Sequence, residues 1–94
     1  MNTAAMTRRT CYFSGTVQGV GFRYTVQNLA LQYDVKGYVR NTSDGRVELV
    51  MEGPAQQMDA LMDDIRQKMN GYIDSVTVSE SPASGEFHRF CIRH

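Results

Sequence analysis

The chain has 94 residues, of which 41% are hydrophobic, so it is large enough for one folded domain with a modest core. Its 10 lysines and arginines balance 10 aspartates and glutamates, which argues against a nucleic-acid-binding protein, since such proteins normally carry a basic excess. The apolar runs are too short to span a membrane, and no secretory signal is visible at the N-terminus, so we expect one cytoplasmic domain over residues 1–94, with residues 1–7 flexible.

The first half of the chain predicts two strands joined by a glycine-rich segment and a helix. Residues 9–14 contain threonine and aromatic residues typical of a strand, and residues 15–21 contain three glycines. The apolar residues that follow recur with helical spacing: Phe22, Val26, Leu29, Ala30 and Tyr33. Residues 35–40 predict a second strand, and the cluster at 42–45 predicts a hairpin turn because it contains Asp-Gly.

The second half predicts a return strand, a second helix and two further strands. Residues 46–52 alternate as in a strand with one apolar face (Val47, Leu49, Met51) and one acidic face (Glu48, Glu52). Gly53-Pro54 ends this strand, and proline suits the first turn of the helix that follows. The apolar face of that helix is Met58, Leu61, Met62, Ile65 and Met69, and Asn70-Gly71 ends it. Residues 73–79 and 87–93 predict the last two strands, with a loop at 81–85.

This order of elements, β-α-β-β-α-β with an additional C-terminal strand, predicts an α+β protein. Two helices and five short strands do not fit a doubly wound parallel sheet. They fit a ferredoxin-like α/β sandwich, with an antiparallel or mixed sheet and both helices on one of its faces. The apolar helix faces are assigned to the core, and their methionines to filling it rather than to binding metal.

The glycine-rich segment between the first strand and the first helix, residues 15–23, is the most informative part of the sequence. Glycines at such a turn let backbone N–H groups converge at the positive end of a helix dipole, where phosphate or carboxylate groups bind. Arg23 adds a permanently charged planar group that matches an oxyanion. The other interpretation is that the glycines only permit a tight turn. The spacing is neither that of a Walker loop nor that of a dinucleotide fingerprint.

Two segments together resemble the acylphosphatase family. Residues 15–23 match its first signature, G-x-V-Q-G-V-G-F-R, throughout. Residues 37–48 match its second signature, G-W-V-x-N-x-x-D-G-x-V-E, except that Tyr38 replaces the usual tryptophan. Because Tyr38 alternates with Val39 and Asn41, we expect it on the open face of the sheet, where the change has little effect. The resemblance extends over roughly residues 9–93, including a terminal Phe90-x-Ile92.

The resemblance implies hydrolysis of a carboxyl–phosphate anhydride to a carboxylate and inorganic phosphate. By position, Arg23 and Asn41 are the expected catalytic residues, with Asn41 orienting the attacking water. The residues expected to bind phosphate are Val17, Gln18, Gly19, Val20, Gly21, Phe22 and Arg23. Gly15 and Thr42 are candidates for supporting the site, although Gln18 and Thr42 fit a turn or surface role equally well.

No metal and no cofactor is expected, because the carboxylate leaves without a general acid and a loose phosphoryl-transfer transition state needs mainly charge stabilisation. His88 and His94 have no partner motif and are expected at the surface or in packing. Cys11 and Cys91 could form a disulfide by number alone, but free thiols are favoured. In the family, the C-terminal strand lies beside the second strand and away from the first, which makes this disulfide improbable.

Two other classes of function remain open from the residues. One is a non-catalytic or partner-serving acylphosphatase-like module, such as the one at the N-terminus of a hydrogenase maturation carbamoyltransferase. Tyr24-Thr25 stands here in place of the Pro-Phe typical of that subgroup. The other is an anion-sensing regulatory domain. The expected partner is a small-molecule acyl phosphate, with no nucleic acid and no membrane, and the expected oligomeric state is a monomer.

Overall fold

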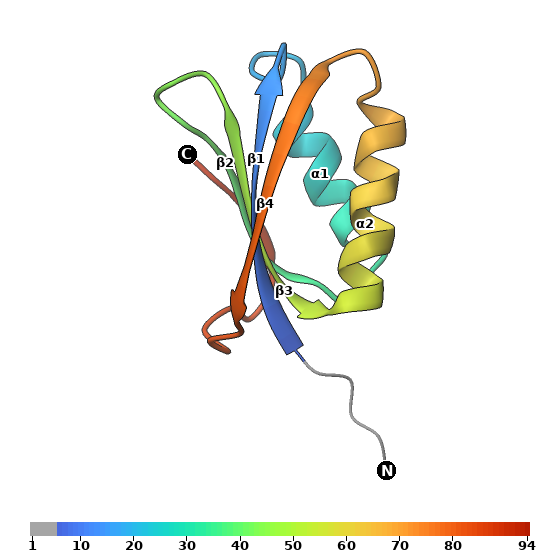
Figure 1. Ribbon diagram of the computed structural model, residues 1–94, viewed down its shortest axis with the longest axis vertical. Coiled ribbons are helices and arrows are strands. Elements are labelled where there is room, and N and C mark those ends of the chain that lie inside the picture. Colours follow the sequence, from blue (N-terminus) through green and yellow to red (C-terminus); the bar gives the residue numbers. More distant parts are fainter. Residues whose placement is uncertain (1–5) are drawn as a thin grey trace.

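Two helices cover one face of a five-stranded sheet in the computed structural model, which describes residues 6–94 (Figure 1). In chain order the elements are β1 (Met6–Gly15), α1 (Phe22–Ala30), β2 (Lys36–Asn41), β3 (Val47–Pro54), α2 (Ala55–Lys68), β4 (Ile73–Pro82) and β5 (Phe90–Arg93). The α+β ferredoxin-like architecture with an added C-terminal strand, as predicted from the sequence, is confirmed.

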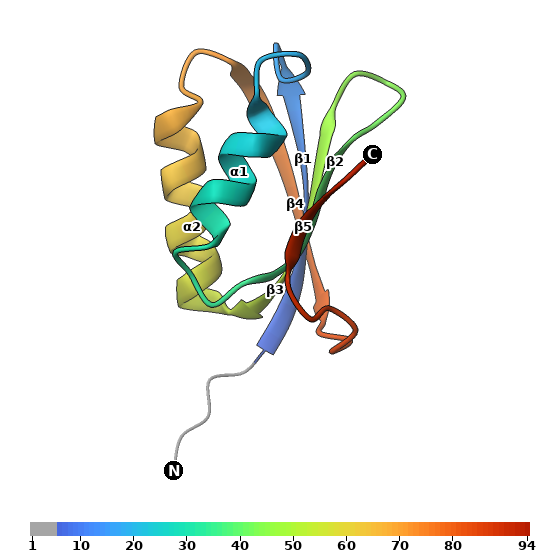
Figure 2. The ribbon, with the colours of Figure 1, turned by 180° about the vertical axis from the view of Figure 1, so that it is seen from behind.

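The strand order in the sheet is β4-β1-β3-β2-β5. Neighbouring strands are antiparallel except β2 and β5, which are parallel, so the sheet is mixed. The parallel ladder pairs Gly37 with Phe90 and Arg40 with Arg93, which carries the chain beyond β5 toward the end of β2 (Figure 2). This arrangement confirms the expected position of the last strand beside the second.

Several element boundaries differ from the predicted ones. Met6 and Thr7 belong to β1 rather than to a flexible terminus, while the rest of that predicted segment lies outside the described residues. Helix α1 ends at Ala30, before Tyr33. Pro54 is the residue that precedes α2 rather than part of its first turn. Strand β4 extends to Pro82 by pairing with β1, and β5 begins only at Phe90.

The hydrophobic core lies between the sheet and the two helices. Its largest fully buried side chains come from both layers and include Phe13, Phe22, Leu49, Met51, Met58, Leu61 and Ile65. The rings of Phe13 on β1 and Phe22 on α1 are in contact, with centroids 5.0 Å apart. This contact fixes the start of α1 against the sheet, and the glycine-rich loop lies between the two residues.

The opposite face of the sheet contains two buried carboxylates. Glu52 accepts hydrogen bonds from Arg8 Nε (2.7 Å) and from the backbone N–H groups of Ser84 (2.9 Å) and Gly85 (3.0 Å). Burial alone would raise the pKa of Glu52, but these hydrogen bonds outweigh it and lower the pKa to about 2. Glu48 is held in the same way by Tyr12 and Arg40, and its pKa is also lowered.

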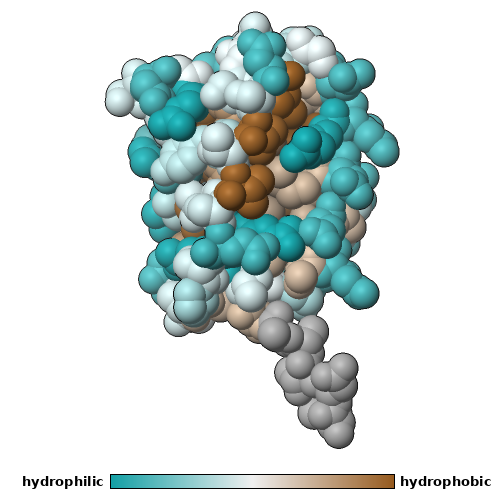
Figure 3. Space-filling model, in the orientation of Figure 1, coloured by the Kyte–Doolittle hydropathy of each residue, from teal (hydrophilic) through white to brown (hydrophobic). Residues whose placement is uncertain are grey.

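Tyr38 lies on this open face, as expected from its alternation with buried Val39. Its ring contacts the ring of Phe87 edge-on, with centroids 5.9 Å apart, and the guanidinium of Arg93 lies 3.8 Å from its centroid. On the other side of the sheet, apolar residues gather along the edge strand β4 in Figure 3. Val78 of this strand pairs with the core residue Cys11 and is 49% exposed.

Both cysteines are free. Cys11 on β1 and Cys91 on β5 are separated in the sheet by β3 and β2, so the structure confirms that they do not pair. Cys11 is fully buried, and burial raises the pKa of its thiol to about 11, which keeps it protonated at neutral pH.

Within residues 6–94, neither helix has the length and hydropathy needed to cross a membrane.

Candidate active site

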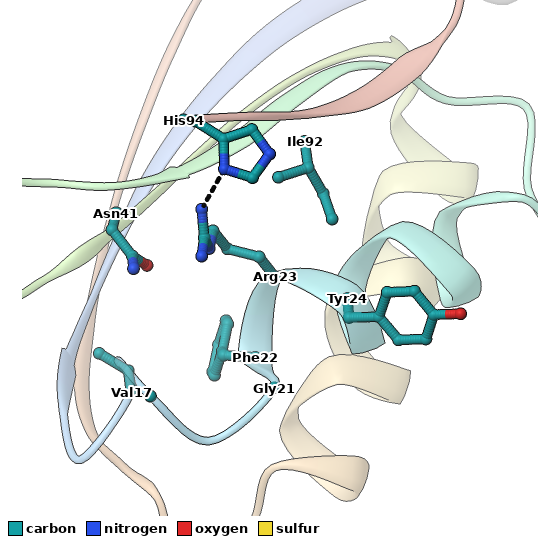
Figure 4. Close-up of a pocket in the computed structure, with 9 residues that line it drawn as sticks. Val17, Gly21, Phe22, Arg23, Tyr24, Asn41, Ile92 and His94 are labelled. Carbon is teal, nitrogen blue, oxygen red and sulfur yellow. Dashed lines mark hydrogen bonds between the residues drawn. The ribbon is translucent and has the colours of Figure 1, made fainter.

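A pocket of about 250 Å³ opens where the β1–α1 loop, the first turn of α1 and the ends of β2 and β5 meet (Figure 4). It is lined by Val17, Gly19, Gly21, Phe22, Arg23, Tyr24, Asn41, Ile92 and His94. The pocket therefore brings together six of the residues predicted from the sequence and three that were not assigned to a site.

The β1–α1 loop is shaped by its glycines. Gly19 and Gly21 have φ angles of 78° and 76°, in the left-handed region that other residues rarely adopt. Gly15, predicted to support the site, acts at the base of the loop, because a Cβ there would lie 2.4 Å from the carbonyl oxygen of Tyr72. The neighbouring Thr16 N–H donates to that same oxygen at 2.9 Å, which anchors the loop to the start of β4.

The backbone N–H groups of residues 17–24 donate to no acceptor in the described part of the chain. The first backbone bond of α1 runs from Thr25 N–H to the carbonyl oxygen of Gly21, at 3.0 Å. Gly21 precedes the helix and has no side chain to cap it, and the first turn contains no acidic residue. The positive end of the helix dipole therefore lies at the pocket, together with unpaired donors of those loop and helix residues that line it. This is an arrangement that binds small anions.

Arg23 lies in the first turn of α1 and points into the pocket (Figure 4). Its Nη1 lies 3.3 Å from Nδ1 of His94. Among the described residues Arg23 has no carboxylate partner, whereas Arg8, Arg9, Arg40 and Arg46 are all in ion pairs. Its charge is therefore available to an anion in the pocket.

Gln18 and Thr42 connect the loop to the β2–β3 hairpin rather than lining the pocket. The side-chain Nε2 of Gln18 donates to the carbonyl oxygens of Thr42 (2.9 Å) and Arg46 (2.8 Å). The hydroxyl of Thr42 is bonded to Asp44 and Arg46 within the hairpin turn. Val20 also lies off the pocket, since its side chain packs against the core. Both Gln18 and Thr42 thus hold the position of the strand end that carries Asn41.

Asn41 is the last residue of β2, and its side chain lines the pocket. Its Oδ1 is buried and has no hydrogen-bond partner within residues 6–94. An unpartnered buried acceptor is costly, so a group that donates to it, such as a water molecule, would be favoured at this position.

Tyr24, Ile92 and His94 were missed as pocket residues in the reading of the sequence. His94 was expected at the surface or in packing, and it is exposed, but its ring also contacts Arg23 at the pocket, which was not predicted. The pairing of β5 with β2 carries His94 to this position, and a local sequence pattern contains no sign of that pairing. Tyr24 could have been considered from its place next to Arg23 at the start of the helix.

The donor set of the pocket suits an oxyanion and not a metal ion. Across residues 6–94, no group of three or more His, Cys, Asp or Glu side chains is placed to hold a metal. The pocket instead offers backbone N–H groups, a guanidinium and one free amide oxygen. The fold and this pocket define a small α+β protein whose first strand–helix loop can hold a phosphoryl-sized anion.

Comparisons with known proteins agree with the fold and with the kind of site described above. The acylphosphatase family model matches residues 9–92. A curated acylphosphatase of Paenarthrobacter aurescens is 42% identical over 86 residues, which cover 90% of this chain and 92% of that protein. The crystal structure of acylphosphatase from Bacillus subtilis has a TM-score of 0.86 and 34% identity, and the match covers 94% of this chain and 99% of that chain.

The chain belongs to the acylphosphatase family, as the two signatures indicated. The predicted class of enzyme, a hydrolase acting on acyl phosphates, is confirmed by the same comparisons. The fold also occurs inside a larger protein: the crystal structure of full-length HypF in its phosphate- and nucleotide-bound form has a TM-score of 0.84 and 32% identity. That match covers 99% of this chain but 12% of the HypF chain.

Proposed function

We propose that this chain hydrolyses the carboxyl–phosphate bond of acyl phosphates without a metal, holding the phosphoryl group with the β1–α1 loop and Arg23 and the attacking water with Asn41. One observation carries the proposal: unpaired loop donors, the guanidinium of Arg23 and the free amide oxygen of Asn41 meet in one pocket, and among the described residues this guanidinium has no carboxylate partner. We further propose that the protein works as a cytoplasmic monomer.

The phosphoryl group would bind where the loop N–H groups and Arg23 converge. The transition state of phosphoryl transfer spreads negative charge over the three equatorial oxygens. Donors that are already in position at those oxygens stabilise this charge without reorganising, which is a large source of catalysis. In this proposal the left-handed backbone of Gly19 and Gly21 shapes the loop so that its donors can reach the phosphoryl oxygens.

The water would donate one hydrogen bond to Oδ1 of Asn41 and attack phosphorus from that side. An amide is not a base, so the water proton passes to a phosphoryl oxygen of the substrate. As the new P–O bond forms, the bond between phosphorus and the acyl oxygen breaks, and its electron pair leaves with the carboxylate. A carboxylic acid has a pKa of roughly 4, so the leaving group needs no proton from the protein.

A non-catalytic module is the second candidate function. It is favoured by the HypF match, in which a domain like this chain forms a small part of a larger protein. Two observations favour the enzyme: Tyr24-Thr25 stands in place of Pro-Phe, and the chain is 42% identical to a curated acylphosphatase.

The test is an assay of the purified protein on acetyl phosphate with excess chelator. We expect turnover that the chelator does not reduce, and loss of about 100- to 1,000-fold in kcat for Asn41→Ala and Arg23→Gln, the usual cost of removing one transition-state contact. Asn28→Ala and Arg66→Gln are the matched controls, because both side chains are exposed on helices outside this pocket. Absence of turnover by the unmodified protein would contradict the proposal that it is an acyl phosphate hydrolase. Full activity of Asn41→Ala would contradict the proposal that Asn41 holds the attacking water.

A further inference from the structure

We infer that Glu52 is a positioning residue of the active site: its carboxylate holds the loop of residues 83–89, and this loop holds β5 so that His94 stays beside Arg23. The link to the reaction rests on the proposed function, because it takes the pocket as the phosphate site.

Both carboxylate oxygens of Glu52 are bonded to the 83–89 loop, and the residue is only 4% exposed. Its Oε2 accepts hydrogen bonds from the backbone N–H and the hydroxyl of Ser84, both at 2.9 Å. Its Oε1 accepts one from the N–H of Gly85 at 3.0 Å. Arg8 on β1 donates to Oε2 through Nε at 2.7 Å. Hydrogen bonds to a charged group are the strong ones, so those from the loop fix it to β3, the central strand of the sheet.

The loop has few other attachments. Among residues 6–94, no hydrogen bond between two backbone groups involves residues 84–88. The ring centroid of Phe87 lies 5.9 Å from that of Tyr38 and 5.0 Å from the guanidinium carbon of Arg8. Because Arg8 is itself ion-paired with Glu52, the carboxylate supports this aromatic contact as well. Glu52 is therefore at the centre of the contacts that hold the loop.

Strand β5 depends on the loop because its own pairing is short. It has four residues, lies at the edge of the sheet and pairs only with β2. The carbonyl oxygen of Arg89, the last loop residue, accepts a hydrogen bond from Gly37 N–H at 3.1 Å, where this pairing begins. Short edge strands open locally at low cost, and a freed loop adds conformational entropy to the open form. Loss of the bonds to Glu52 should therefore loosen β5 from its first residue.

The other end of β5 lies at the active site. Figure 2 shows the 83–89 loop and the C-terminus toward opposite ends of the sheet, with β5 between them. His94, just beyond β5, contacts Arg23. Asn41, in contrast, belongs to β2 and pairs with Val47 of β3. Glu52 thus acts on the group that holds the phosphoryl oxygens rather than on the one that holds water.

Hydrogen exchange of Glu52→Gln tests whether this residue holds the loop. A glutamine has one acceptor oxygen and turns an NH2 group toward the remaining donors, so it cannot keep all of these bonds. At pH 7 we expect the amides of residues 84–93 to exchange about tenfold faster relative to those of α2, because the local opening becomes easier. Ser84→Ala, which removes one of the bonds, is a milder variant and should accelerate the same amides less.

Glu48→Gln is the matched control. Glu48 is a second buried carboxylate on the same face of β3, and its partners Tyr12 and Arg40 lie outside the 83–89 loop. The two variants lose the same charge from the same strand, but only Glu52→Gln loses bonds to the loop. In Glu48→Gln we expect residues 84–93 to exchange as they do in the unmodified protein.

Binding of inorganic phosphate, followed by NMR titration, tests the path through His94. We expect the dissociation constant to rise about two- to fivefold in Glu52→Gln, as for His94→Ala itself. In a chain that already carries His94→Ala, Glu52→Gln should add less than about 1.5-fold, because two changes that act through one contact are not additive. While the protein remains folded, a loss of stability alone does not change this constant.

Unchanged exchange of residues 84–93 in Glu52→Gln, or the same acceleration in Glu48→Gln, would overturn the role of Glu52 in holding the loop. Effects of Glu52→Gln and His94→Ala that multiply in the double variant would overturn the path through His94. Absence of phosphate binding to the unmodified protein would overturn this inference and the proposed function together, whereas binding without turnover would contradict the hydrolase alone.

Discussion

Arg23 at the start of α1 donates a hydrogen bond to His94, which follows β5, with Nη1 and Nδ1 3.3 Å apart (Figure 4). A guanidinium has donors only, so the imidazole must accept at Nδ1 and carry its proton at Nε2. The bond joins two residues far apart in the sequence and gives Arg23 a neutral partner, which orients the guanidinium without neutralising its charge.

Removing this partner should weaken phosphate binding modestly. In His94→Ala, Arg23 keeps its charge but loses one contact that orders it, and an exposed hydrogen bond of this kind contributes about 0.5–1 kcal/mol. We expect the inhibition constant for inorganic phosphate to rise about two- to fivefold, with His94→Gln close to the unmodified protein because its amide oxygen can accept the same bond. Equal inhibition constants for all three proteins would show that the contact does not orient Arg23.

Gln18 should matter through the position of Asn41. Gln18→Ala removes both hydrogen bonds that tie the β1–α1 loop to the β2–β3 hairpin, at a cost of about 1–2 kcal/mol in stability. We expect kcat for acetyl phosphate to fall at least tenfold, since the water and the phosphoryl group are no longer held in register. Gln18→Glu is the sharper comparison, because its carboxylate has the same shape and cannot donate, and kcat near the unmodified value in that variant would contradict the prediction.

Gly21 should be needed for the anion site and not only for the turn. Gly21→Ala places a Cβ at a φ of 76°, which costs about 1–2 kcal/mol although no atom lies within 4 Å of it. Gly85→Ala is a matched control, with a φ of 75°, equally open space and a position away from the pocket. Thermal unfolding should show similar destabilisation in both variants, whereas only Gly21→Ala should weaken inhibition by phosphate. Similar inhibition constants in the two would mean that the loop tolerates the change.

Glu52 should make the fold sensitive to acid. Its pKa is lowered from 4.5 to about 2, so its contribution to stability is complete above pH 4.5 and is lost as the pH falls toward 2. That contribution is on the order of 3 kcal/mol for a shift of this size. Urea unfolding between pH 5 and pH 2 should therefore show a smaller acid loss in Glu52→Gln than in Glu86→Gln, whose side chain is exposed. If the free energy of unfolding falls equally with pH in the two variants, the acid sensitivity of the fold does not come from Glu52.

The parts of the site that lie in short continuous segments could be predicted from the sequence. The glycines, Arg23 and Asn41 occur in two segments with characteristic spacing, and the pocket contains all of them. Gln18 belongs to the same segment, but its side chain turns to the hairpin because two carbonyl oxygens at Thr42 and Arg46 are within reach there. Spacing along the chain does not specify such a choice.

Other features depend on contacts between distant segments. Alternation placed Glu48 and Glu52 on the open face correctly, but only the folded chain shows that they are buried, because Arg8, Arg40 and the segment at Ser84 lie over them. Phe87 is an aromatic residue of a type common in strands, and the sequence predicted it in the last strand, residues 87–93. It lies instead in the loop before β5, where its ring packs on Tyr38 and the guanidinium of Arg8.

The parallel pairing of β5 with β2 has a consequence for folding. Ile92 and His94 reach the pocket only when β5 has docked, so a chain that has formed the rest of the sheet still lacks one wall of the site. A ligand that binds the native state alone stabilises it in proportion to the logarithm of its concentration. Inorganic phosphate would therefore select molecules in which the last strand is in place, and phosphate protection against unfolding becomes a measure of how completely the chain has folded.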